Sequence, residues 1–314
     1  MQEKYTSQRL DDFDGEINLK ELFYILLKEK WIIVSLTAFA SIFAVLYSLS
    51  LPNIYQSKAL LAPVNPSSNI SGAFGNYGNF PGVSGLNLFS DVQNGNAPKA
   101  IKQISSLYFF EKNILPNIYL PDLMAFKSWN PKTNTVTFDN DIYDTNTNTW
   151  IREYSYPRQQ IPSAQESFKV FTTKNLSLSE DRKSGFVTLS IKHQSPFIAK
   201  QWVELIVNEI NGFYRQKDKL ESEKSVSYLN QQISKTDLSE INQVLAQLLQ
   251  EETKKLTLIE ANQFYVFDYI DLPAAMELKS EPNRALICIF IALIGGIFSV
   301  ILVLIRHYAF SGKA

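Results

Sequence analysis

The sequence predicts a domain of mixed strands and helices held between two membrane-spanning helices. Two runs without any Asp, Glu, Lys or Arg, residues 31–51 and 285–305, lie near the two ends of the chain. As a helix each run would span about 32 Å, close to the roughly 30 Å hydrocarbon core of a bilayer. The polar stretch between them contains one β-hairpin pattern and two long helical patterns. We therefore expect one folded domain attached to a membrane at both ends.

The charges around the first run predict the orientation. Lys20, Lys28 and Lys30 precede it within about 20 residues, whereas only Lys58 follows within the same distance, which favours a cytoplasmic N-terminus. About 30 residues, several of them acidic, precede the run, so a retained anchor fits better than a cleaved signal peptide. The expected organisation is a cytoplasmic tail (1–30), a first membrane helix (31–51), an outer domain (52–284), a second membrane helix (285–305) and a second cytoplasmic tail (306–314).

The composition argues against a nucleic-acid partner and against a disulfide bond in the outer domain. The formal net charge is −1 and the pI is about 6.2, so nothing indicates a nucleic-acid partner. The only cysteine, Cys288, lies in the second membrane run, and the outer domain therefore has no disulfide. Packing or neighbouring subunits must stabilise it.

The first half of the outer domain gives weak signals. Residues 53–62 read as a strand or an extended segment, residues 63–98 as a long loop rich in Gly, Asn, Ser and Pro, and residues 99–115 as an amphipathic helix. Residues 116–162 are expected to be irregular. They contain an Asp139, Asp141, Asp144 spacing that opens like a calcium loop but lacks its central Gly and closing Glu, so a solvated turn is favoured over a metal site.

Residues 168–195 give the clearest β signal, because two alternating arms flank the turn RKSG. In the second arm Val187, Leu189 and Ile191 share one face, which predicts a hairpin with one buried side. Residues 264–272 (FYVFDYIDL) read as a further strand that ends before Pro273.

A long helical region lies between these strand patterns. Ser195-Pro196 is a favourable helix start, and apolar residues then recur at three- and four-residue spacing. Residues 213–234 would span about 33 Å and residues 239–262 about 36 Å, which predicts an outward helix, a tip near residues 235–238 and a return helix. Asp237 and Glu240 have the spacing of a capping box for the return helix. One uninterrupted helix to residue 262 is the alternative.

No pattern of catalytic side chains is apparent. The two histidines, His193 and His307, lie at the end of a strand pattern and beyond the second membrane run, and no Ser/His/Asp, Cys/His or HExxH arrangement is available. We expect no enzymatic activity, no cofactor and no metal.

Several segments resemble the Wzz-type chain-length determinants, which are polysaccharide co-polymerases of the bacterial inner membrane. The similar segments are residues 16–52 (EINLKELFYILLKEKWIIVSLTAFASIFAVLYSLSLP), SGLNL at 84–88, LMAFKSWNP at 123–131, GFVTLSIKHQSP, AKQWVELIVNEIN and the YVF…ID strand. The family's Pro-rich approach to the membrane and Gly-rich second helix correspond here to Pro273, Pro282, Arg284, Gly295 and Gly296. The chain departs from that motif at Met276, Glu281, Asn283 and Ser299.

The resemblance implies an α+β fold: a mixed base near the membrane, a long helical hairpin rising from it, and a ring of identical subunits in the inner membrane with the main domain in the periplasm. It further implies a non-enzymatic regulator of the length of a lipid-linked, O-antigen-like polysaccharide. The implied partner is the membrane polymerase, and the growing lipid-linked glycan is a further candidate partner. The expected length-tuning surface is the hairpin, with the candidate residues Phe213, Leu220, Leu229, Ile233, Ile241, Leu245 and Leu248.

Two alternatives remain. One is an exporter-type co-polymerase that works with a separate tyrosine kinase, since the nine residues after the second span leave no room for a fused kinase domain. The other is a periplasmic sensor or scaffold protein, although the short tails offer little room for a cytoplasmic output module.

Overall fold

The structure, a computed structural model, describes residues 19–64, 96–262 and 264–311. It divides into two units, one formed by the chain up to Pro52 and from Pro282 onward, the other by residues 53–281. The Gly-rich loop expected at residues 63–98 falls mostly outside the described residues, as does the SGLNL segment.

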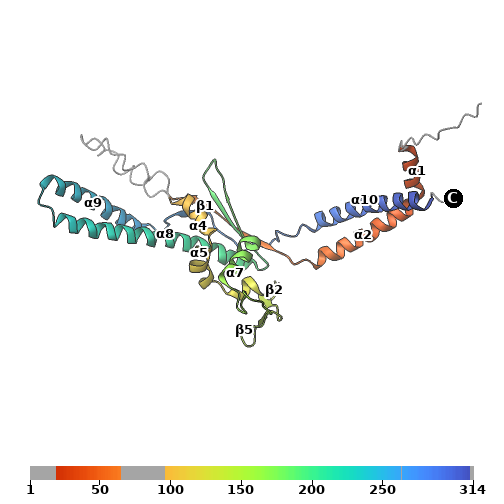
Figure 1. Cartoon of the computed structure of the whole chain (residues 1–314), viewed down its shortest axis with the longest axis horizontal. Helices are drawn as coiled ribbons and strands as arrows, with labels where there is room; N and C mark the ends of the chain where they lie inside the picture. The colour runs from red at the N-terminus through yellow and green to blue at the C-terminus, as the bar shows by residue number, and fades with distance from the viewer. Residues whose placement is uncertain (1–18, 65–95, 263, 312–314) are drawn as a thin grey trace, which may run out of the picture. The chain divides into compact units, whose positions relative to one another are not determined.

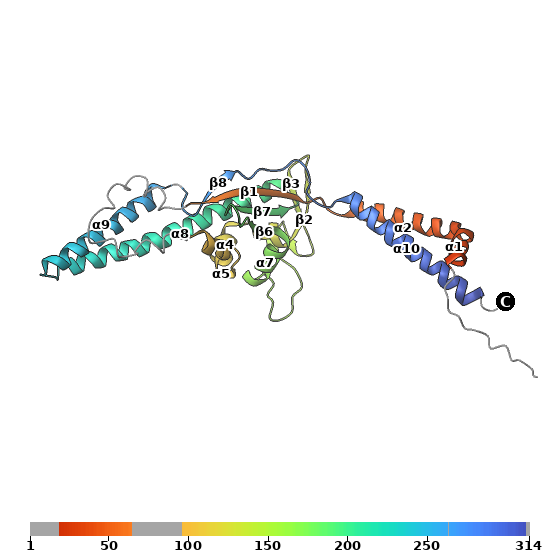
Figure 2. The ribbon, with the colours of Figure 1, turned by 90° about the horizontal axis from the view of Figure 1, so that it is seen from above.

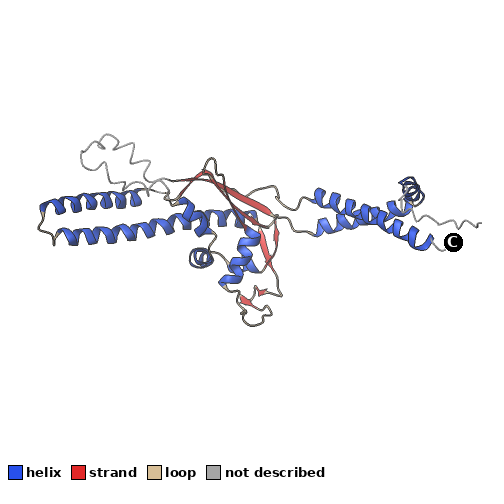
Figure 3. Ribbon diagram, turned by 45° about the horizontal axis from the view of Figure 1, so that its top comes forward, coloured by secondary structure: helices blue, strands red, loops and turns tan. Residues whose placement is uncertain are grey.

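The first unit is a helical pair with a short additional helix. Helices α2 (Lys30–Ser50) and α10 (Arg284–Ser311) lie side by side (Figures 1 and 3), and α1 (Leu19–Lys28) contacts both. Both long helices are apolar and long enough to cross a membrane. Large apolar side chains such as Phe39, Leu46 and Ile289 are exposed on them, as expected of surfaces that meet lipid rather than water. The two apolar helices predicted from the sequence are confirmed.

The second unit is built on a four-stranded antiparallel sheet of order β6-β7-β1-β8. Its strands are β1 (Tyr55–Pro63), β6 (Leu176–Glu180), β7 (Val187–His193) and β8 (Phe267–Asp271). The predicted buried face of β7 is confirmed, because Val187, Leu189 and Ile191 are fully buried together with Ala59 and Leu61 of β1. The two ends of this unit meet: Ile54 N donates to Glu281 O at 2.9 Å, and Ser280 N donates to Ile54 O at 2.8 Å.

The prediction of a single helix at residues 99–115 is wrong. The chain instead forms α4 (Ala97–Ile104), α5 (Leu107–Phe109), the π-type turn η2 (Phe110–Ile114) and the 3₁₀ turn η3 (Leu115–Asn117). Ser106 makes the break, because its Oγ donates to Gln103 O at 2.8 Å and accepts from Phe109 N at 3.2 Å, ending one helix and capping the next.

The irregular structure expected at residues 116–162 is also wrong in part. Helix α6 (Leu120–Met124) is followed by two small hairpins, β2 (Phe126–Asn130) with β3 (Thr135–Phe138) and β4 (Tyr143–Asp144) with β5 (Thr149–Trp150). Aromatic rings hold them together, with the Tyr143 ring centroid 5.1 Å from that of Trp150 and 5.9 Å from that of Phe138. Such short strands leave almost no periodicity to detect.

The predicted strand arm at residues 168–175 is helical. Ser163 caps α7 (Ala164–Val170) in a capping box with Glu166, and the π-type turn η4 (Phe171–Asn175) leads into β6. Tertiary packing overrides the β-like composition here, since the rings of Phe168 and Phe171 both pack on Phe110.

The predicted helical hairpin is confirmed, and the uninterrupted helix is wrong. Helix α8 (Pro196–Ile233) and helix α9 (Ser239–Ala261) run side by side (Figure 2), and the first half of α8 packs against β1 and β7. The capping box at Asp237 is wrong, because Leu238 occupies the cap position without a side-chain bond. Asn242 Nδ2 instead bonds Thr236 O across the tip at 2.6 Å. The observed fold is thus a mixed helix and strand unit plus two apolar helices.

Candidate functional site

The buried histidine of the second unit is held in one neutral form. His193 Nδ1 accepts from Ser195 N at 3.0 Å, so Nε2 carries the proton and donates to Asp122 O at 3.1 Å. Burial lowers the pKa of His193 to about 4. Within the described ranges no cluster of three or more His, Cys, Asp or Glu could hold a metal ion. His193 therefore has the geometry of a structural group.

The membrane helix pair has a close contact at the predicted glycines. A Cβ atom added at Gly295 would lie 2.6 Å from Ala40 Cβ, which is closer than carbon atoms approach without a backbone shift. A Cβ at Gly296 would lie 3.9 Å from Thr37 Cγ2, an ordinary contact. Gly295 is thus the position at which a small residue permits the close approach of α2 and α10.

Polar side chains continue this contact. Ser299 is fully buried, and its Oγ donates to Gly296 O at 2.7 Å and lies 3.5 Å from Thr37 Oγ1. Ser299 departs from the family pattern, but its side chain is small enough for the two helices to approach closely. It also places a hydroxyl group between the helices.

The Pro-rich approach spans the boundary between the two units. Pro273 is buried in the second unit shortly after β8, whereas Pro282 begins the returning segment of the first unit. Asn283, another departure, caps α10 because its Oδ1 accepts from Leu286 N at 3.3 Å. Arg284 Nη2 donates to Leu51 O at 3.4 Å, which joins the start of α10 to the end of α2.

A buried asparagine fixes the return from the hairpin. Asn211 Oδ1 accepts from the backbone N–H groups of Tyr265, Val266 and Phe267 at 3.2, 2.7 and 2.9 Å, and its Nδ2 donates to Phe267 O at 3.0 Å. The side chain on α8 therefore positions the chain where it enters β8. Sequence analysis missed this residue, because an isolated Asn in an apolar helix stripe has no distinguishing pattern.

A second polar cluster supports the root of the hairpin. Asp218 Oδ2 accepts from Tyr265 Oη at 2.6 Å and from Asn96 Nδ2 at 2.8 Å. Arg215 Nη2 donates to Asn262 O at 2.7 Å at the end of α9. An ion pair between Lys219 and Glu260 lies one turn further along the two helices. Polar contacts thus join the two helices where the hairpin meets the base.

The predicted length-tuning residues do not form one exposed surface. Leu220, Ile241 and Leu248 are exposed on the hairpin by 49, 46 and 36%. Leu229 is buried, so it does not belong to the exposed surface. Phe213 packs on the base with its ring centroid 5.9 Å from that of Phe109. The two remaining residues are half-buried, namely Ile233 and Leu245.

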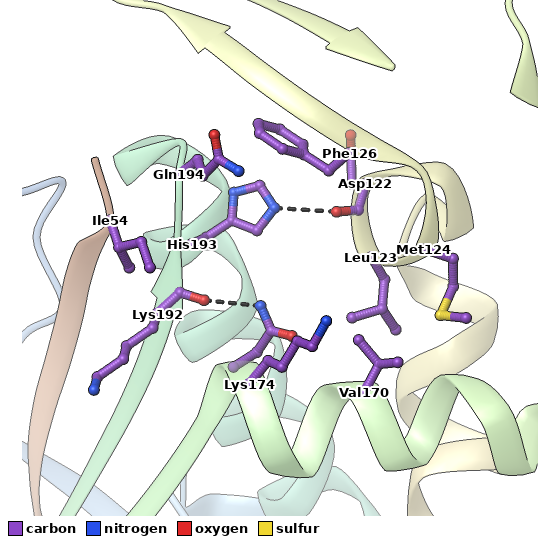
Figure 4. Close-up of a pocket in the computed structure, with 11 residues that line it drawn as sticks. Ile54, Asp122, Leu123, Met124, Phe126, Val170, Lys174, Lys192, His193 and Gln194 are labelled. Atoms are coloured by element: carbon purple, nitrogen blue, oxygen red, sulfur yellow. Dashed lines mark hydrogen bonds between the residues drawn. The ribbon is translucent and has the colours of Figure 1, made fainter. Parts of the chain in front are cut away.

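A polar hollow of about 280 Å³ opens in the second unit beside the end of β7 (Figure 4). Its walls come from α6 with the start of β2, from the junction of α7 and β6, and from the end of β7. The lining residues are Ile54, Asp122, Leu123, Met124, Phe126, Val170, Lys174, Asn175, Lys192, His193 and Gln194. Sequence analysis gave no indication of it, because the walls come from segments far apart in the chain.

The charges in this hollow are of both signs. Burial raises the pKa of the Asp122 carboxyl to about 6. The Lys192 ammonium is paired with Glu281 at 2.5 Å and points away from the hollow, whereas the amine of Lys174 is turned toward it (Figure 4). Asn175 is occupied by a bond from its Nδ2 to Lys192 O at 2.8 Å.

One family model matches the first third of the chain. Residues 15–107 match the family described as Wzz, chain length determinant protein. The resemblance to the Wzz family is therefore confirmed over this segment. The segment contains α1, α2, β1 and α4, while the hairpin and α10 lie beyond it. No curated protein sequence matches the chain.

Two solved structures are similar to this chain. One is described as "full-length bacterial polysaccharide co-polymerase", with 14% identity, a TM-score of 0.42, and coverage of 95% of this chain and 100% of that chain. The other is described as "Fragment of WzzB, Polysaccharide Co-polymerase from Salmonella Typhimurium", with 13% identity, a TM-score of 0.32, and coverage of 73% of this chain and 100% of that chain.

Proposed function

We propose that this protein is a non-enzymatic regulator of the chain length of a lipid-linked, O-antigen-like surface polysaccharide. The single observation that carries the proposal is the match of residues 15–107 to the chain length determinant family. The two apolar helices flanking a folded unit support it, because a regulator of membrane-bound synthesis must itself be held at the membrane.

The proposed location is the bacterial inner membrane, with both termini cytoplasmic and residues 53–281 in the periplasm. The excess of lysines before α2 supports this orientation. The meeting of Ile54 with Glu281 supports attachment of one unit to one membrane face at both ends. Cysteine labelling of single sites on the hairpin in intact spheroplasts tests it, and labelling only after lysis would contradict it.

The proposed working form is a closed homo-oligomer that contacts the membrane polymerase. Leu220, Ile241 and Leu248 leave apolar area exposed on the hairpin, and a facing copy would remove that area from water. Mass measurement of the full chain in mild detergent should give a multimer, and monomer at every concentration would contradict the ring.

Deletion of the gene tests the function directly. The length distribution of the cell's lipopolysaccharide on a gel should lose its mode, and the full chain should restore it. An unchanged lipopolysaccharide ladder with a loss of exported capsule would favour the exporter-type alternative. Purified protein should neither extend nor cleave lipid-linked glycan unless the polymerase is present, and turnover by the protein alone would contradict a non-enzymatic role.

A further inference from the structure

The hollow beside β7 presents hydrogen-bonding groups that have no partner among the described residues. Within the described residues, no hydrogen bond or ion pair occupies the side chains of Asp122, Lys174 or Gln194, although all three line the hollow. By contrast, the Asn175 Nδ2 group and both ring nitrogens of His193 bond to backbone groups. The three free side chains come from three different segments, so the fold, not the local sequence, brings them to one place.

The three groups differ in what they can bind. An ionised carboxylate only accepts, an ammonium only donates, and an amide does both. A simple anion would satisfy Lys174 but face the Asp122 carboxylate, and a simple cation would have the reverse difficulty. A ligand with adjacent hydroxyl groups satisfies all three, because every hydroxyl both donates and accepts.

The rest of the wall is apolar. Leu123 and Met124 from α6 and Val170 from α7 also line the hollow, beside Asp122 and Lys174 (Figure 4). Binding sites for small molecules commonly combine an apolar surface with a few polar groups that fix orientation. Such sites for drug-sized ligands have volumes of roughly 300–1,000 Å³, so a volume of about 280 Å³ suits a single small ring.

We propose that this hollow binds one neutral hexopyranose residue of a glycan. The C–H face of the sugar ring would lie on Leu123 and Val170, and its adjacent hydroxyls would bond Asp122, Lys174 and Gln194. Choosing a sugar from among polyhydroxylated ligands rests on the proposed function. The site would let the protein contact the polymer whose length it regulates.

Binding is tested with the full chain in lipid nanodiscs, which avoid the sugar headgroups of glycoside detergents. The probes are the methyl glycosides of glucose, galactose, mannose and N-acetylglucosamine, together with glucuronate and inorganic phosphate. Saturation-transfer NMR reports which probe is bound, and titration gives the dissociation constant. At least one neutral glycoside should bind in the millimolar range.

Two variants with matched controls locate the site. Asp122→Ala and Lys174→Ala should each weaken binding about tenfold or more, because each removes a charged hydrogen-bond partner. Asp141→Ala and Lys169→Ala change the same residue types at exposed positions outside the hollow and should bind as the native chain does. Asp122→Asn keeps the side-chain shape and should also weaken binding, which guards against misfolding of the alanine variant.

Three results would overturn the inference: no neutral glycoside binds, the variants bind as well as the controls, or only glucuronate and phosphate bind and depend on Lys174 alone. The last would assign an anion site. These outcomes are separate from the gene-deletion result, because a chain that restores the polysaccharide ladder without binding any glycoside would leave the proposed function intact.

Discussion

Substitution of Asn211 tests whether its hydrogen bonds fix the chain where it returns from the hairpin into β8. Replacing it with Ala would leave three buried backbone N–H groups, those of residues 265–267, without their acceptor. A buried unsatisfied donor costs roughly 1–3 kcal/mol, so the three together cost about 3–9 kcal/mol. Water entering the space left by the side chain would satisfy some of them, which places the expected loss at about 3–5 kcal/mol.

That loss is a large part of the total stability of a domain, which is roughly 5–15 kcal/mol. For a unit of about 230 residues, each kcal/mol lowers the melting temperature by roughly 2–4 °C. The expected decrease for Asn211→Ala is therefore about 6–20 °C. Thermal unfolding of the full chain in nanodiscs, followed by tryptophan fluorescence, measures it, because Trp202 is buried on the same helix.

Asn208→Ala is the matched control. Asn208 lies one turn before Asn211 on α8 but is exposed, and none of its side-chain atoms takes part in a hydrogen bond within the described residues. Exposed substitutions of this kind usually change stability by less than about 0.5 kcal/mol. If Asn211→Ala melts within about 2 °C of this control, the asparagine bonds do not fix the entry into β8.

Three further predictions follow from the contacts described above. Gly295→Ala should disturb the modal polysaccharide length at a normal protein level, whereas Gly296→Ala should not, because only the first added methyl group collides with the facing helix; equal gel patterns for both would contradict this. Ile241→Ser on the exposed hairpin should shift the modal polysaccharide length to a new value without abolishing length control. Complete loss of length control would contradict a geometric role. Acidification from about pH 7 to about pH 5 stabilises the fold through Asp122, because its raised pKa lets the native state bind a proton before the unfolded state does. The same acidification destabilises the fold through His193, because its lowered pKa keeps the native imidazole neutral while the unfolded one binds a proton. Asp122→Asn should therefore lose more melting temperature than the native chain over this pH interval, and equal losses would refute the opposition of the two groups.

The sequence by itself determined the features that depend on one segment. The two apolar helices follow from uninterrupted hydrophobicity, and the hairpin of α8 and α9 follows from apolar periodicity that breaks near residue 235. The buried face of β7 follows from strict alternation. In each case the signal repeats over many neighbouring residues, so no knowledge of the rest of the fold is needed.

The tertiary structure decided what depends on distant segments. Residues 168–175 have a strand-like composition, but capping at Ser163 and packing of Phe171 on Phe110 make them helical. The small hairpins between residues 126 and 150 depend on aromatic contacts rather than on periodicity.

The candidate sites depend on the fold in the same way. The role of Asn211 exists only because β8 returns to α8, about 55 residues later in the chain. The hollow exists only because three separate segments bring Asp122, Lys174 and Gln194 together. Hydrogen bonds and cavities of this kind form between elements that are distant in the sequence. The pattern of one segment does not predict which other segment will pack against it.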